Sequence, residues 1–243
     1  VEPERDVAGD LVVWQIAVQQ ALLAFVDRHP TPGGYGAPIK DTLAAARHAA
    51  DLAASENASL IALLPGGDPR FDGPAAVFDV LLPPTERRLI DGRGALALPD
   101  QTAVYLCHPQ ASAAMSVLGG TATELDQPLL LRTGSEDRYR FFRREPVDLT
   151  LQNPVTDSRH WRLPSAQGQR SAVRLLSYAW EDGPRPGQTL HWTTTWRVEG
   201  EPPSSIDLHW FNHVVDETGA RWGQRDGVGL PVSDWRSGDT VVT

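Results

Sequence analysis

The chain has 243 residues, enough for one large domain or two ordinary ones, each with a core of its own. Its formal net charge of −9 and its single lysine, Lys40, exclude a protein that binds nucleic acid through clustered basic side chains. Cys107 is the only cysteine, which excludes an internal disulfide and a thiolate metal cage. We therefore expect neither a nucleic-acid partner nor a cofactor.

Helix-type and strand-type segments alternate in the first part of the chain. Apolar residues at helical spacing predict an amphipathic helix over residues 7–26, and Pro38 opens a second, alanine-rich helix over 39–57. Further helices are expected at 74–82 and at 110–120, the latter stopped by glycine, and strands at 60–64, 87–92, 95–99, 103–109, 128–133 and 139–145. This alternation predicts an α/β layered domain over residues 1–148.

After residue 148 the pattern changes to β-type runs separated by turns rich in Pro and Gly. The runs are at 171–180, 188–200, 205–216 and 240–243. In "TLHWTTTWRV" polar and aromatic residues alternate, which places Trp192 and Trp196 on one face of a strand. The sequence therefore predicts an all-β antiparallel sandwich over residues 149–243. No partner follows the last run, so we expect the sandwich to be truncated at its C-terminus.

Motifs for catalysis, nucleotides and metals are weak. The glycine-rich "LIALLPGGDPRFDGPAAVF" lies between a strand and a helix but lacks both the GxGxxG pattern and a phosphate-loop lysine. Cys107 and His108 are neighbours on a strand and point to opposite faces, so we expect Cys107 in the core and no nucleophile–base pair. His209 and His213 on one strand stand about 13 Å apart, too far to share one ion. We predict no catalytic and no metal residue.

Tryptophan is the more informative residue, because seven of the eight follow residue 160. Exposed Trp rings beside polar side chains are typical stacking platforms for sugars. Trp192 and Trp196 are predicted to be core residues. The predicted ligand residues, which lie near turns, are Trp222, Gln224, Asp226 and Trp235. A structural alternative stays open, in which Trp235 is buried beneath the 226–234 loop and Asp226 accepts hydrogen bonds from that loop.

The segment "HWFNHVVDETGARWGQRDGVGLPVSDWRSGDTVVT" resembles a region near the C-terminus of large bacterial membrane glycosyltransferases. These belong to the dolichyl-phosphate-mannose protein mannosyltransferase and lipid A aminoarabinose transferase group, sometimes labelled family 39. The residues that fall in matching order are His213, Asp216, Gly219, Gln224, Asp226, Trp235 and Gly238. Val232 and Ser233 replace the family's Pro-Thr pair. Earlier, "GGYGAPIKDTLAAARHAA" and "IALLPGGDPR" look like the segment after the family's last membrane helix.

In that family the donor is a polyprenyl-phosphate sugar, and the catalytic carboxylate lies in a loop between early membrane helices, to which nothing in this chain corresponds. The resemblance implies a non-catalytic, water-soluble accessory region on the extracytoplasmic face of the bacterial cell membrane. Its partner would be the membrane-embedded part of the same polypeptide, with a glycan or a lipid-linked sugar as a further ligand. Two alternatives stay open: a free-standing carbohydrate- or protein-binding module, and a hydrolase or transferase with its site in the α/β loops.

Overall fold

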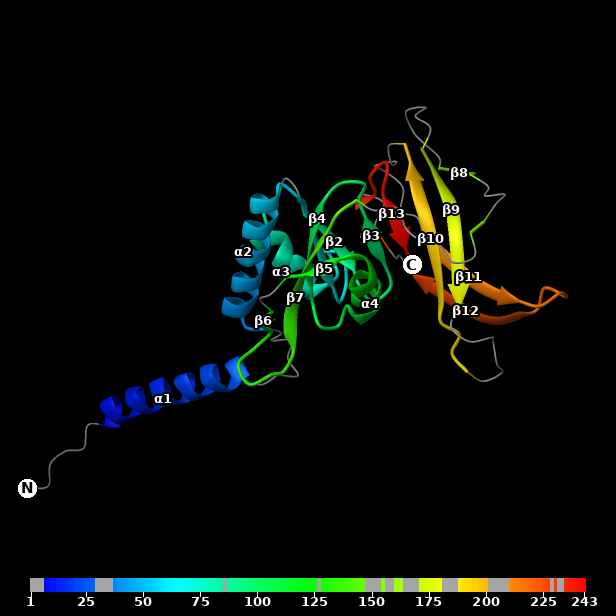
Figure 1. Cartoon of the computed structure of the whole chain (residues 1–243). Coiled ribbons are helices and arrows are strands. Elements are labelled where there is room, and N and C mark those ends of the chain that lie inside the picture. Colours follow the sequence, from blue (N-terminus) through cyan, green and yellow to red (C-terminus); the bar gives the residue numbers. More distant parts are fainter. Residues whose placement is uncertain are drawn as a thin grey trace, which may run out of the picture.

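The chain is a mixed α/β protein (Figure 1). The computed structural model describes residues 7–28, 37–84, 87–125, 128–146, 154–155, 160–163, 171–180, 188–200, 210–227, 230 and 234–243. Within these ranges it has four helices, a six-stranded mixed sheet, a five-stranded antiparallel sheet and a two-stranded hairpin.

The mixed sheet forms the centre of the first part of the chain. Its strands are β1 (Ser59–Leu64), β2 (Arg87–Asp91), β4 (Ala103–Cys107), β5 (Thr123–Glu124), β6 (Leu129–Leu130) and β7 (Arg138–Arg144). The order is β2-β1-β4-β7-β5, with β6 paired to β7. β1 pairs in parallel with β2 and β4, whereas β7 runs antiparallel to β4. The strands predicted at β1, β2 and β4 are confirmed. Their sequences are almost wholly apolar because both faces of the sheet are covered.

Helices cover this sheet on both faces. α2 (Ile39–Glu56) and α3 (Gly73–Leu81) contribute to the core on one face, and α4 (Ser112–Thr121) to the core on the other. Pro38 precedes α2, and Asn57 ends it in the left-handed conformation at φ 49°, as expected for a helix C-cap. The predicted glycine stop of α4 is wrong: the helix runs through both glycines to Thr121.

The second sheet joins the two parts of the chain. Its strands are β3 (Leu96–Leu98), β8 (His160–Leu163), β9 (Ser171–Trp180), β10 (Trp192–Glu199) and β13 (Thr240–Val242), in the order β3-β13-β10-β9-β8. Val241 lies opposite Trp196 on one side and Ala97 on the other. β13 therefore has strand partners on both sides, β10 and β3. A register shift between Thr195 and Trp196 breaks the strict alternation predicted for β10.

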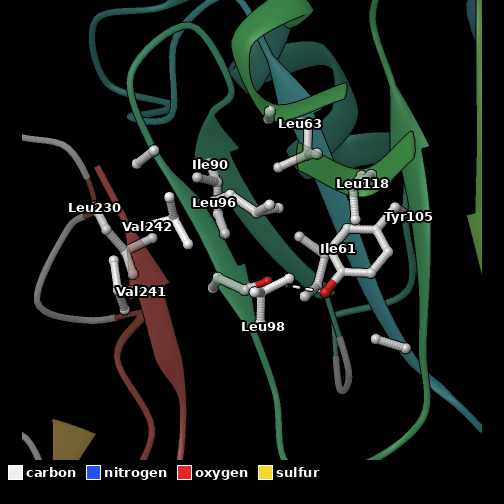
Figure 2. Packing of buried hydrophobic residues seen from close by; sticks show 14 of the residues in the cluster. Ile61, Leu63, Ile90, Leu96, Leu98, Tyr105, Leu118, Leu230, Val241 and Val242 are labelled. Atoms are coloured by element: carbon white, nitrogen blue, oxygen red, sulfur yellow. Dashed lines mark hydrogen bonds between the residues drawn. The ribbon is translucent and has the colours of Figure 1, made fainter. Parts of the chain in front are cut away.

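One hydrophobic cluster spans both sheets (Figure 2). It brings Ile61 and Leu118 of the first part together with Val241 and Val242 of β13. The buried hydroxyl of Tyr105 donates to the carbonyl of Ala97 at 2.9 Å, which ties β4 to β3. Residues on either side of position 148 thus share a sheet and a core, while a domain boundary at 148/149 stays a prediction.

A buried ion pair makes a second link between the two parts. The Arg88 guanidinium on β2 lies 2.6 Å from the Asp239 carboxylate, and the two side chains are 1% and 3% exposed. The contact lacks the alignment of a hydrogen bond. Asp239 Oδ2 also accepts the Arg236 N–H at 3.1 Å. Between them Gly238, at φ +89°, packs so tightly on Asp100 that a Cβ would lie 2.3 Å from its Oδ2. The turn before β13 is therefore held against the first part of the chain.

The predicted N-terminal helix is α1 (Val7–Arg28), which Figure 1 shows extending away from the sheets. The predicted helix is confirmed, but its apolar side chains are not packed against either sheet. The side chains described from Val12 to Phe25 are all exposed.

Candidate functional site

Two of the four predicted ligand residues, Trp222 and Gln224, lie exposed on a hairpin formed by β11 (Trp210–Val215) and β12 (Arg221–Gly227). The hairpin turns at Asp216, whose N–H donates to the Ala220 carbonyl at 3.0 Å. Gly219 adopts φ +84°, a left-handed conformation that favours glycine. The turn and the register of the two strands thus position the exposed side chains.

Trp222 is held in a fixed direction while its ring faces solvent. It is 68% exposed, and its Nε1–H donates to Asp216 Oδ2 at 2.9 Å. Asp216 Oδ1 accepts from the Thr218 hydroxyl at 2.6 Å, the Thr218 N–H at 2.9 Å and the Ala220 N–H at 3.0 Å. The Thr218 hydroxyl and then the Trp222 indole are the main donors that lower the pKa of Asp216 to about 2. A charged carboxylate therefore orients an exposed indole.

Gln224 and Asp226 lie farther along β12. Gln224 is opposite His213 in the register, and both side chains are exposed. Asp226 is opposite Phe211, and its side chain lies outside the described part of the structure. The proposed hydrogen bonds between Asp226 and the 226–234 loop lie outside it as well. Gln224 is thus on the same hairpin as Trp222, within reach of solvent.

Trp235 is separated from the other three by burial. It is 2% exposed, belongs to the cluster that contains Val241, and donates its Nε1–H to the Leu230 carbonyl at 3.0 Å. Trp235 is therefore buried, as in the alternative interpretation of the sequence, and its indole anchors the turn before β13. The four predicted residues therefore do not form one surface.

Sequence reasoning missed a second exposed aromatic group, on β9. The rings of Tyr178 and Trp180 lie 5.4 Å apart, tilted by 31°, and Trp180 is 52% exposed. Trp192 of β10, predicted to be a core residue, is opposite Trp180 in the register and only partly buried. The signal was present in the sequence, because aromatic residues two apart on a strand share a face. This face of the five-stranded sheet thus offers a tilted ring pair to solvent.

The glycine-rich loop after β1 uses its N–H groups internally. The Asp68 N–H donates to the Asp72 carboxylate at 3.0 Å, and the Arg70 N–H donates to the Asp68 carboxylate at 2.9 Å. The Arg70 side chain pairs with Asp68 as well, at 2.6 Å. A phosphate would have to compete with these carboxylates for the N–H groups. The loop is therefore a turn from strand to helix whose N–H donors are bonded within the loop.

Cys107 and His108 do not form a reactive pair. Cys107 is buried in the cluster below α4, and burial raises the pKa of its thiol. His108 lies beside Tyr139 on the opposite side, with ring centroids 5.7 Å apart. Burial lowers the pKa of His108 to about 4, and its Nδ1 accepts the Gln110 N–H at 3.2 Å. As predicted, Cys107 fills core space. The residues described also contain no group of three or more His, Cys, Asp or Glu side chains arranged to hold a metal ion.

Comparison of the chain with protein-family models, with curated proteins and with solved structures finds no match. Among the helices described, none is long and apolar enough to pass through a membrane.

Proposed function

We propose that this chain is a non-catalytic, extracytoplasmic accessory region of a polyprenyl-phosphate-sugar-dependent membrane glycosyltransferase, and that it holds a glycan near the enzyme. Glycan binding is proposed because the indole of Trp222 is exposed and its direction is fixed by a hydrogen bond to Asp216. A rigid aromatic face loses little conformational entropy when a flat, apolar sugar face stacks on it. Gln224 on the same hairpin supplies hydrogen-bonding groups for hydroxyls.

The resemblance in residue order to the glycosyltransferase group supports the proposed parent enzyme. Asp216 and Gly219 build the hairpin turn that carries Trp222. If the glycosyltransferases have the same hairpin turn, Asp216 and Gly219 are expected at matching positions in them. We further propose that the second part of the chain is a β-sandwich, in which the β11–β12 hairpin belongs to the layer opposite the five-stranded sheet.

A free-standing carbohydrate-binding module is the second candidate. The exposed Tyr178–Trp180 pair favours it, because a tilted ring pair on a sheet face offers two neighbouring stacking surfaces. This module would need no membrane-embedded partner.

Glycan binding is tested with the whole chain on a glycan array, followed by titration of any glycan retained. Trp222→Ala should abolish binding and leave the free energy of unfolding within about 0.5 kcal/mol of wild type, as for other surface changes. Trp222→Phe is the matched control, since it keeps an aromatic face and should retain part of the affinity. Trp180→Ala should have little effect if the hairpin is the site, whereas it should abolish binding if the sheet face is. Binding that survives both alanine substitutions would contradict both versions.

The glycosyltransferase parent is tested by the genomic sequence upstream of Val1. Several apolar spans of about 20 residues in the same reading frame would support it. A signal peptide directly upstream would contradict it and favour the free-standing module.

A further inference from the structure

α1 carries large apolar side chains that no other described part of the chain covers. Those exposed between 47% and 68% are Val12, Val13, Trp14, Ile16, Val18, Leu22 and Leu23. Figure 1 shows the helix extending away from both sheets. Single exposed apolar residues are common on proteins, but a continuous set of this size marks a surface for binding.

These side chains surround the helix instead of forming one stripe. At about 100° per residue, they fall on two arcs on opposite sides of the helix, each about 80–100° wide. Val12, Ile16 and Leu23 mark the first arc, and Val18 and Leu22 mark the second. One partner helix, such as α1 of a second copy, would cover one arc and leave the other in water. A helix that is apolar nearly all round is typical of a fully apolar environment.

The polar residues of α1 fit a lipid environment as well. From Leu11 to Val26 the helix contains no Asp, Glu, Lys or Arg, a stretch of about 24 Å at 1.5 Å per residue. Gln15 and Gln19, one turn apart, make a narrow polar stripe between the two arcs, and the third glutamine, Gln20, lies within the first arc. The gap on the other side is filled by alanines. This stretch is shorter than the roughly 20 apolar residues needed to cross the hydrocarbon layer.

We infer that α1 inserts into one leaflet of a lipid bilayer without crossing it, with the Gln15–Gln19 stripe toward the headgroups. The contact is apolar. α1 has almost no basic residues, and the chain has a net charge of −9, so anionic lipid gives no attraction. We expect α1 to bind membranes of zwitterionic phosphatidylcholine, and added salt should not release the protein. Lipid binding by α1 does not depend on the proposed function, in which glycan binding is tested at Trp222 and the glycosyltransferase parent by the upstream genomic sequence.

The test is flotation of the whole chain with phosphatidylcholine vesicles. One variant places charges on the first arc, Ile16→Asp with Leu23→Asp, and another on the second arc, Val18→Asp with Leu22→Asp. The matched control, Phe71→Asp with Val80→Asp, changes two apolar residues of the sheet-bearing part that are more than 80% exposed. Each α1 variant should lower the partition coefficient at least about tenfold, since charge in hydrocarbon is costly. The control should bind like wild type.

A second measurement does not depend on folding of the charged variants. Vesicles of brominated phosphatidylcholine should quench wild-type tryptophan fluorescence, and Trp14→Phe should lose most of that quenching. The inference is overturned if wild type does not float, if salt releases it, or if only one arc matters. It is also overturned if sedimentation shows that α1 pairs two copies and the vesicles do not compete with that pairing.

Discussion

Removal of the Asp239 carboxylate should be the most damaging single change to an ionisable group in this fold. Arg88 and Asp239 are 1% and 3% exposed, and their charged atoms lie 2.6 Å apart. Without Asp239, the Arg88 guanidinium stays buried beside Tyr105 with no counter-charge in contact. Breaking a buried pair from one side costs about 3–5 kcal/mol, and loss of the bond from the Arg236 N–H adds about 1 kcal/mol. We therefore expect Asp239→Ala to lower the free energy of unfolding by about 4–6 kcal/mol.

Two further variants separate charge from packing. Asp239→Asn keeps the acceptor for the Arg236 N–H and removes only the charge, so it should recover about 1 kcal/mol relative to alanine. Arg88→Met combined with Asp239→Ala removes the unpaired cation and should be more stable than Asp239→Ala alone. Urea unfolding with equal m-values gives these differences. A cost of Asp239→Ala below about 1 kcal/mol, or simple additivity of the Arg88 and Asp239 substitutions, would show that the buried pair does not stabilise the fold as proposed.

Four other outcomes are expected. Trp235→Ala should cost about 3–5 kcal/mol in urea unfolding, as for a buried aromatic, and a loss below about 1 kcal/mol would contradict its role as an anchor. Tyr105→Phe should cost about 1 kcal/mol, because its hydroxyl bonds a buried carbonyl on β3, and an unchanged stability would show that this bond is unimportant. The folded-state pKa of His108 is lowered to about 4 from 6.5, so the neutral ring contributes stability above pH 6.5 that is lost as the pH falls toward 4. His108→Gln should remove a slope of about 1 kcal/mol per pH unit in that window, measured as the wild-type minus variant difference, and identical profiles would rule this out. Limited proteolysis should first cut within residues 153–170, yet the fragments should co-elute on gel filtration because they share a sheet, and separation of the fragments would argue against that sheet.

Local patterns predicted most of the helices and the apolar strands. Pro38 and the alanine-rich run that follows mark α2, and the unbroken apolar run of β1 reflects burial on both faces. β12 was missed because "RWGQRDG" contains residues that are poor strand formers, and pairing with β11 overrides that preference. The pairing of β13 with β3 was missed because no local pattern specifies which distant strand will be a neighbour.

The candidate site was predictable in part. Trp222 lies near a turn and is exposed, as its position in the sequence indicates. Trp235 lies near a turn too, but its indole is buried in a cluster that includes residues far away in the sequence, such as Leu96 of β3. The spacing of Tyr178 and Trp180 predicts that the two rings share one face of a strand. Their exposure could not be predicted, because it depends on which parts of the sheet the rest of the chain covers.

The pairing of β3 with β13 has a consequence for synthesis on the ribosome. Thr240 is synthesised about 7–28 s after its partner Leu98 at typical elongation rates. During that interval the nascent α/β part presents β3 as an open strand edge, with Leu96 and Leu98 still uncovered by β13. Open apolar edges recruit other chains. Truncated products that end before β13 should therefore aggregate or be retained by chaperones, because only pairing with β13 covers this edge of β3.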